Sequence, residues 1–384
     1  MTGSGTALIV GAGIGGLAAA IALRKAGWQV RVHERAAAPR ELGFALALAP
    51  NAMAALRELG VADVLAADGA AVTKAEIRHP DGRVVRRFST QPGGPMIVAL
   101  RTALHGSLLE AVGGDMLRLG SEAIGYRASP QEVVLELRDG GQDAGDVLIG
   151  ADGVGSIVRR RLHPAEAPPR PSGYCAVRGI AFDVGHNLGD LAAVAFLGDG
   201  VEAAAARASR NAVYWYLSLL ADDLAGSRDP KAILEQTTRG FDPAFRAITG
   251  ATTIEDMRFD QLFERDPLPS WGSGRVTLLG DAAHPVLPHT GQGAAQSLED
   301  AVALGLALSR NWGIGQSLRE YERIRSRRTR RFVKLGPRIA RVTTTRNRVV
   351  QWSRTLAIRV LPEALIAGKI QRPPKDPHRE LRSG

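Results

Sequence analysis

Three glycines near the start of the chain have the spacing of a phosphate-binding turn. Gly11, Gly13 and Gly16 lie between a strand-like stretch at 6–10 and a helix-prone stretch at 17–26. The first glycine permits a tight turn, the second lets a pyrophosphate approach the backbone, and the third lets the helix pack closely on the strand. Free N–H groups at the start of the helix favour an anion. The turn therefore predicts a bound dinucleotide.

An acidic residue supports this prediction and narrows it. Glu34 ends a second strand-like stretch at 29–34, eighteen residues after Gly16. A carboxylate there can accept hydrogen bonds from an adenosine ribose and would repel a 2′-phosphate. We therefore expect the tightly held nucleotide to be FAD or NAD rather than NADP. A glycine turn without a ligand is the simpler alternative, but the order of strand, turn, helix, strand and acidic residue argues against it.

Two further motifs follow apolar stretches typical of buried parallel strands. They are IGADGVGSIVR at 149–159 and LLGDAAHPVLPHTGQGAAQSLEDA at 278–301. Together with GAGIGG at 11–16, their sequence resembles that of the single-component (class A) FAD-dependent monooxygenases, the aromatic hydroxylases related to para-hydroxybenzoate hydroxylase and salicylate hydroxylase. The three motifs span most of the first 310 residues.

The resemblance implies a fold and a division of the chain. The expected fold class is α/β, with a Rossmann-like FAD-binding domain interleaved with a β-sheet-rich substrate domain, followed by C-terminal helices. We expect the FAD-binding domain at residues 1–72, 101–167 and 272–312. The substrate domain is expected at 73–100 and 168–271, and a basic helical region at 313–384.

The same resemblance assigns roles in the cofactor site. Asp281 would contact the ribityl chain of FAD, Asp152 and Gly153 would serve both FAD and the reduced pyridine nucleotide, and Arg101 would approach the flavin pyrophosphate. The simpler alternatives are a helix-capping aspartate, a turn and a surface arginine. The full set of expected cofactor-binding residues is Gly11, Ala12, Gly13, Ile14, Gly16, Glu34, Arg35, Arg101, Asp152, Gly153, Gly280, Asp281, Gly291, Gln292, Gly293, Ala294 and Ala295.

The loop before the last motif's helix contains the candidate catalytic residues. A helix beginning near Gly293 would direct its N–H groups at the flavin and stabilise the reduced anion. Pro288 resembles the proline that borders the space where oxygen reacts. His289 departs from the small or apolar residues usual in the family. It could assist deprotonation of a phenol, or it could only shape the pocket or hydrogen-bond the backbone.

Candidate substrate residues lie in the middle of the chain. Arg178 belongs to an Arg-Gly pair that resembles one at the start of the family's substrate domain. Tyr214 and Tyr216 lie in VYWYL, where strand alternation places them opposite Trp215. Core packing of these aromatic side chains is the alternative.

The sequence contains one dinucleotide-binding motif, which FAD would occupy, and no second one for a pyridine nucleotide. NADH or NADPH would therefore bind transiently. The resemblance implies that NAD(P)H reduces the flavin, that O2 forms a C4a-hydroperoxyflavin, and that one oxygen hydroxylates an aromatic or polycyclic small molecule. The alternatives are a flavin epoxidase or oxidative tailoring enzyme of secondary metabolism, and a flavin dehydrogenase or reductase. A halogenase is disfavoured because the Trp-x-Trp-x-Ile-Pro motif is absent from the sequence.

Composition limits the other possibilities. Cys175 is the single cysteine, which excludes an internal disulfide and favours the cytoplasm. Neither a transmembrane segment nor a metal site is expected, because no apolar run is long enough and no HExxH motif occurs. We expect a monomer or a homodimer.

The net charge of +10 comes from the C-terminal part of the chain. Residues 317–384 contain nineteen Lys and Arg against five Asp and Glu. We favour a solvated helical face whose arginines also pair with acidic groups elsewhere in the fold. A basic binding protein that attaches to nucleic acid or an anionic surface is the non-enzymatic alternative. The scarcity of aromatic residues there argues against nucleic acid.

Overall fold

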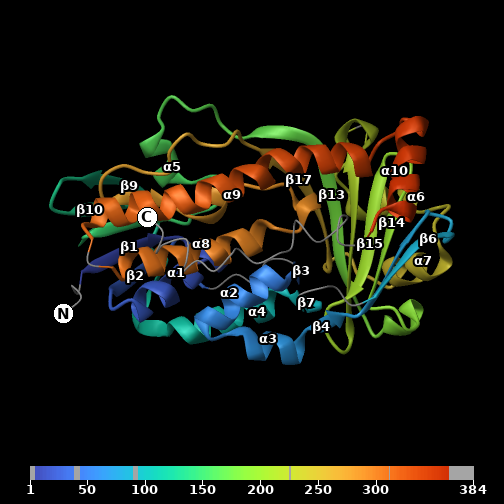
Figure 1. The fold of residues 1–384 in the computed structure, drawn as a ribbon, viewed down its shortest axis with the longest axis horizontal. Coiled ribbons are helices and arrows are strands. Elements are labelled where there is room, and N and C mark those ends of the chain that lie inside the picture. Colours follow the sequence, from blue (N-terminus) through green and yellow to red (C-terminus); the bar gives the residue numbers. More distant parts are fainter. Residues whose placement is uncertain (1–4, 39–43, 90–93, 225, 311, 363–384) are drawn as a thin grey trace.

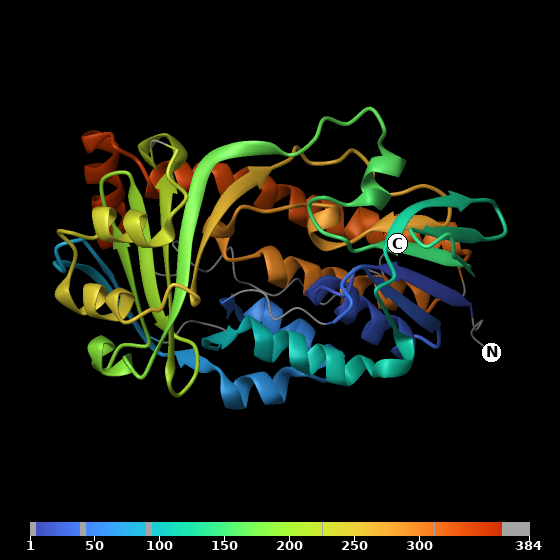
Figure 2. The same ribbon diagram turned by 180° about the vertical axis from the view of Figure 1, so that it is seen from behind.

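The computed structural model describes residues 5–38, 44–89, 94–224, 226–310 and 312–362. Figures 1 and 2 show two lobes, one containing a parallel sheet with helices and the other a large sheet that is antiparallel except for the parallel pair of β5 (Lys74–Arg78) and β14 (Ala193–Leu197). The long helix α9 (Ile314–Thr343) runs along both lobes. This arrangement confirms the expected α/β class.

The first lobe is built on a five-stranded parallel sheet in the order β18-β12-β1-β2-β8. Apolar sequences such as TALIV and VLIG form its buried central strands. Helix α1 (Ile14–Lys25) packs against α4 (Arg101–Val112) and α8 (Gly293–Leu308). The strands are β1 (Thr6–Val10), β2 (Gln29–Glu34), β8 (Leu117–Leu119), β12 (Val147–Gly150) and β18 (Val276–Leu278).

Smaller elements complete this lobe. A three-stranded sheet has the order β11-β10-β9, and α5 packs against β9. A second small sheet has the order β3-β7-β4. The elements are β3 (Ala45–Leu48), α2 (Pro50–Leu59), α3 (Ala62–Asp68), β4 (Ala70–Val72), β7 (Met96–Leu100), β9 (Ala123–Ala128), β10 (Val133–Leu137), β11 (Gln142–Gly145) and α5 (Ile157–Leu162).

The second lobe is a seven-stranded sheet in the order β17-β13-β16-β15-β14-β5-β6. One face packs on α6 (Pro230–Thr237) and α7 (Pro243–Gly250) around a core that includes Phe196, Trp215 and Phe245. The strands are β5 (Lys74–Arg78), β6 (Val84–Ser89), β13 (Arg170–Phe182), β14 (Ala193–Leu197), β15 (Val201–Arg207), β16 (Ala212–Leu220) and β17 (Met257–Glu264).

The C-terminal region is helical as far as the structure describes it. Helix α9 covers Ile314–Thr343 and α10 covers Arg348–Val360, while residues 363–384 of the expected region lie outside the described residues. Strands β5 and β6 join the large sheet, whereas β7 pairs with β3 and β4. The exact domain boundaries remain a prediction. Within the described ranges, no helix combines the length and the apolar character needed to cross a membrane.

Candidate functional site

The glycine turn between β1 and α1 has the shape that its sequence predicts. Gly11 has a φ of +102°, and a Cβ atom there would lie 2.6 Å from the carbonyl oxygen of Ala151. A Cβ on Gly16 would lie only 1.9 Å from the carbonyl oxygen of Gly11. By contrast, a Cβ on Gly13 would meet nothing within 4 Å. Gly13 is also the N-cap of α1, and no side chain caps this helix start. The free N–H groups of Ile14 and its neighbours therefore face open space.

Glu34 ties the end of β2 to this turn. Its Oε2 accepts a hydrogen bond from the N–H of Ala12 at 2.9 Å, and its Oε1 accepts one from Ala36 at 2.9 Å. Each carboxylate oxygen keeps a further lone pair that a ribose hydroxyl could use. Arg35 follows and is exposed. The acidic residue thus fixes the turn and still has acceptor capacity on both carboxylate oxygens.

Asp152 and Gly153 form the turn after β12. Oδ2 of Asp152 accepts a hydrogen bond from the N–H of Ile157 at 2.7 Å, at the start of α5. Its Oδ1 is buried and has no hydrogen-bond partner among the described residues. Burial raises the pKa of this carboxyl. Asp152 therefore supports the helix start with one oxygen and has the other available, while Gly153 adopts a φ of +74°.

Asp281 lies in a tight turn, Gly280–Ala282, that follows β18. Its side chain is exposed, yet burial by the surrounding protein raises the pKa of its carboxyl, an effect that His284 and Arg101 oppose. Because the carboxyl of Asp281 is accessible to solvent and still surrounded by protein, it lies in a recess of the surface. Leu279 rather than Asp281 is the N-cap of this turn. Burial also lowers the pKa of Arg101, which begins α4.

The start of α8 completes this side of the site. The turn Pro288–Thr290 leads to Gly291, which has a φ of +62°. Helix α8 begins at Gly293 with no side-chain cap, so the N–H groups of Gly293, Ala294 and Ala295 are available to an anion. The side chain of Gln292 is buried, and its Oε1 accepts hydrogen bonds from Asn51 at 3.0 Å and Gln296 at 3.1 Å.

Strand β16 presents its aromatic residues as the alternation predicts. Trp215 is fully buried in the second lobe, and its Nε1 donates to Oγ1 of Thr252 at 2.8 Å. Tyr214 and Tyr216 lie on the opposite face with ring centroids 6.2 Å apart. The hydroxyl of Tyr216 donates to Oε1 of Glu202 at 2.7 Å. Burial raises the pKa of both tyrosines, so both hydroxyls are neutral near pH 7.

Arg178 lies beside Tyr216 on the same sheet face, next to two charged residues that the sequence analysis missed. Arg258 and Asp260 come from β17, and Arg178 pairs with Arg258 in the strand register. Asp260 lies 2.8 Å from Nε of Arg258 and 3.6 Å from Nη1 of Arg178. Alternation in MRFDQ could have indicated that Arg258 and Asp260 share a face, but not which strand lies beside them.

His289 joins the loop before α8 to this sheet face. Its Nε2 lies 2.8 Å from Oγ of Ser218, and its ring meets the edge of Tyr174 at 5.5 Å. Burial lowers its pKa, so the ring is a neutral imidazole near pH 7. Its Nδ1 is buried without a partner among the described residues. The residue therefore hydrogen-bonds a side chain rather than the backbone, and Pro288 beside it is exposed.

Comparison with known proteins identifies the family. A family model described as "FAD binding domain" matches residues 5–335. The chain belongs to the class A FAD-dependent monooxygenases. It is 34% identical to an aurachin C monooxygenase/isomerase of Stigmatella aurantiaca, over 96% of this chain and 97% of that one. It is also 34% identical to 3-hydroxybenzoate 6-hydroxylase 1 of Aquipseudomonas alcaligenes, with coverage of 84% and 86%.

A solved structure supports the same conclusion. Klebsiella pneumoniae HpxO complexed with FAD and uric acid superposes with a TM-score of 0.89 at 26% identity, covering 96% of each chain. These findings confirm the expected family, the monooxygenase assignment and FAD as cofactor. The residues of this chain fit FAD. Three features suit a long polar ligand: the open space beside Gly13, the uncapped start of α8 at Gly293, and the unpaired Oδ1 of Asp152.

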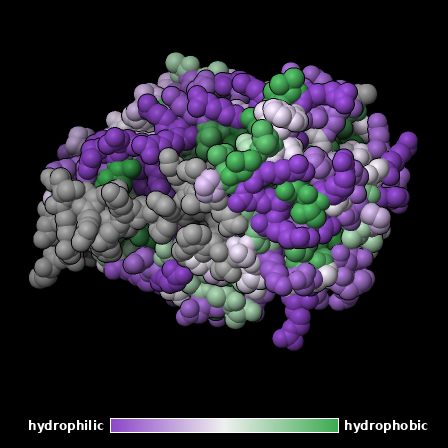
Figure 3. Space-filling view, turned by 45° about the vertical axis from the view of Figure 1, so that its right-hand side comes forward, coloured by the Kyte–Doolittle hydropathy of each residue, from purple (hydrophilic) through white to green (hydrophobic). Residues whose placement is uncertain are grey.

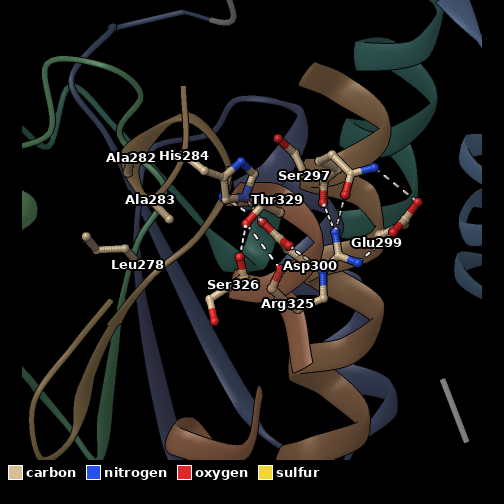
Figure 4. Close-up of polar contacts among 12 residues, drawn as sticks. Leu278, Ala282, Ala283, His284, Ser297, Glu299, Asp300, Arg325, Ser326 and Thr329 are labelled. Atoms are coloured by element: carbon tan, nitrogen blue, oxygen red, sulfur yellow. Dashed lines mark hydrogen bonds and ion pairs between the residues drawn. The ribbon is translucent and has the colours of Figure 1, made fainter. Parts of the chain in front are cut away.

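A buried network holds the loop between β18 and α8 of this monooxygenase in place (Figure 4). Asp300 of α8 accepts hydrogen bonds from the N–H of Gly280 at 3.0 Å and from Nε of Arg325 at 2.6 Å, and it lies 2.5 Å from Nε2 of His284. From the other side, Nη1 of Arg159 donates to the carbonyl of Ala282 at 2.9 Å. The loop containing Asp281 is therefore fixed from two directions.

Arg325 connects this network to the basic C-terminal region. It comes from α9, is buried, and pairs with Asp300 and with Glu299 at 2.5 Å. For this residue the expected pairing of a C-terminal arginine with acidic groups is correct.

Elsewhere, burial raises the pKa of Cys175 to about 11, which indicates a packing role. In the ranges that the structure describes, no three His, Cys, Asp or Glu side chains are placed to hold a metal ion.

Proposed function

We propose that the protein uses NADH or NADPH and O2 to hydroxylate an aromatic or polycyclic small molecule that carries an acidic group. The observation that supports this proposal is the polar face of the large sheet. There, Arg178 and Arg258 share one carboxylate, that of Asp260, beside the neutral hydroxyls of Tyr214 and Tyr216. The cytoplasm is the expected location.

FAD would be held by the residues that line the first lobe's side of the site. The turn at 11–16 and the uncapped start of α1 suit the pyrophosphate, with Arg101 supplying positive charge. Glu34 suits the ribose, Asp281 suits the ribityl hydroxyls, and the start of α8 suits the anionic edge of the reduced ring. When bound and reduced by NAD(P)H, FAD supplies the activation of O2 and the transfer of one oxygen atom.

The charge of the sheet face favours an anionic substrate. Glu202 of β15 lies on the same face and accepts the hydrogen bond of the Tyr216 hydroxyl. On the β13–β17 side of the face, Arg178 and Arg258 lie against the single carboxylate of Asp260, which leaves local positive charge, and both arginines also lower the pKa of nearby Arg101. A phenolate or carboxylate would balance this charge with charge-assisted hydrogen bonds. Deprotonation of a ring hydroxyl also makes the ring richer in electrons, which is the state that accepts an electrophilic oxygen.

Tyr214 would contact the substrate ring directly, and His289 would hold the protein segments around it. The hydroxyl of Tyr214 has no hydrogen-bond partner among the described residues, so it is free to donate to the substrate. His289 uses Nε2 to hold Ser218, and its Nδ1 is inaccessible, so we assign it a positioning role between the α8 loop and β16 rather than that of a base. This choice corresponds to the pocket-shaping alternative.

Labelled dioxygen tests the proposal. The holoenzyme is given phenols, aromatic acids and polycyclic hydroxy compounds in turn, and flavin reduction by NADH and NADPH is followed by stopped-flow absorbance. We expect a substrate that accelerates reduction to gain one 18O atom for each NAD(P)H consumed. A substrate that is turned over without gaining label would refute oxygenation and support the dehydrogenase alternative.

A second candidate reaction is oxygenation followed by rearrangement. It is supported by the nearly full-length match to a relative named both a monooxygenase and an isomerase. The product of an epoxide that opens or rearranges would carry the same oxygen label as a phenol from hydroxylation. It would differ from that phenol in its carbon skeleton or in the position of the labelled oxygen. NMR of the labelled product distinguishes the two reactions.

A further inference from the structure

Helix α10 turns its apolar side outward. The exposed fractions of Val349, Trp352, Leu356 and Val360 are 73%, 67%, 45% and 70%. Their spacing of three, four and four residues places all four on one face of the helix. In a helix of a soluble domain such a stripe normally faces the core. In Figure 3, which brings this end of the molecule forward, apolar patches lie among hydrophilic side chains.

The opposite face of α10 is fixed to the rest of the protein. Nη1 of Arg354 donates to the carbonyls of Val342 at 3.0 Å and Thr343 at 2.7 Å, at the end of α9. Nη1 of Arg86, on β6, donates to the carbonyl of Ile358 at 2.7 Å. Because polar contacts on this inner side set the rotation of the helix, the apolar stripe cannot turn inward without breaking them.

Positive charge surrounds the stripe. Residues 324–362 contain twelve Lys and Arg and no Asp or Glu. Arg348 and Arg359 are exposed on α10 beside the apolar residues, and further exposed basic residues lie on the second half of α9. Among the described residues no acidic group forms an ion pair with the exposed Arg331, Lys334, Arg338, Arg341, Arg348 or Arg359.

We propose that α10 is an interfacial helix that docks this monooxygenase on an anionic lipid bilayer. Trp352 and the aliphatic residues would enter the headgroup region, while Arg348 and Arg359 would meet lipid phosphates. The helix would lie on the membrane and not cross it, in keeping with its 13 residues. A second copy of the chain fits less well, because it would bring the same basic surface against this one. Nucleic acid would leave the apolar stripe uncovered.

Vesicle sedimentation of the full-length holoenzyme tests the docking. The vesicles are phosphatidylcholine alone or a 7:3 mixture of phosphatidylcholine and phosphatidylglycerol. We expect binding to the anionic vesicles, and at least tenfold weaker binding either to the neutral vesicles or in 0.5 M salt. The W352S/L356S variant should lose at least tenfold in partitioning to the anionic vesicles. I254S, which alters an apolar side chain of similar exposure elsewhere, should bind like the parent.

Several results would overturn this proposal. They are no sedimentation of the parent with anionic vesicles, equal binding by W352S/L356S, or a parent dimer that light scattering shows to become a monomer in that variant. Bound FAD and the thermal midpoint, measured on each variant, show that folding is intact. Because the assay contains no substrate or NAD(P)H, its failure would leave the proposed oxygenation standing.

Discussion

At the scale of single residues, Arg258 tests the proposal that charge selects the substrate. It shares Asp260 with Arg178, so the β13–β17 side of the sheet face carries more positive than negative charge. We expect R258Q to raise KM for an acidic aromatic substrate roughly tenfold or more, the scale of a lost charge-assisted hydrogen bond. Steady-state kinetics measure it. R170Q, which alters an exposed arginine on β13, is the control and should leave KM unchanged.

His289 carries a prediction about pH. Burial lowers its pKa, so the folded protein resists protonation of the ring more than the unfolded chain does. Its contribution to stability is complete above the ordinary histidine pKa of about 6.5 and is lost as the pH falls below that value. H289Q should therefore lose less unfolding free energy than the parent between pH 7.5 and 5.5. Urea denaturation measures it, with H186N, an exposed histidine, as the control.

The H289Q experiment also tests whether the burial of His289 causes part of the loss of stability at low pH. His33, His79 and His163 have pKa values lowered in the same direction by burial, so some loss of stability at low pH should persist in H289Q. An H289Q variant with the same pH dependence as the parent would contradict the buried, neutral state of His289.

At the scale of elements, α9 supports the loop between β18 and α8 through one buried arginine, Arg325. Removing Arg325 would leave the carboxylates of Glu299 and Asp300 buried without their main partner. We expect R325A to lower the free energy of unfolding by about 3–5 kcal/mol. Urea denaturation measures this, and R327A is the matched control because Arg327 is exposed on the same helix. Its effect should stay within about 0.5 kcal/mol. Equal effects would contradict the role of the network.

The elements also show what a sequence can predict and what it cannot. The glycine turn was predictable because its geometry admits few residue types, and the two sides of β16 because strand side chains alternate. Arg258 could not be placed, since it reaches Arg178 only through pairing of strands about eighty residues apart. The outward stripe of α10 was missed too. Its spacing alone would indicate an inward face, and the contacts that fix the helix lie in distant segments.

At the scale of the molecule, the two lobes each have a hydrophobic core, and several connections join them. Helix α9 runs along both lobes in Figure 1, and the hydroxyl of its Tyr321 donates to the carbonyl of Leu278 at 3.0 Å. Glu166, before β13, pairs with Arg159 at 2.5 Å and with Arg265, after β17, at 2.9 Å. These contacts link the segments that pass between the lobes, so we expect the lobes to unfold together.

FAD binding should therefore stabilise the whole chain rather than one lobe. At a free FAD concentration of about one hundred times Kd, ligand linkage adds about 2.7 kcal/mol to the free energy of unfolding. Thermal unfolding is followed by flavin fluorescence and by circular dichroism, and both signals should show one transition that moves upward as FAD is added. D281A should show a smaller upward shift at the same FAD concentration, because Asp281 lines the proposed ribityl site. Two separate transitions, of which FAD shifts only one, would show that the lobes unfold independently and that α9 does not couple them.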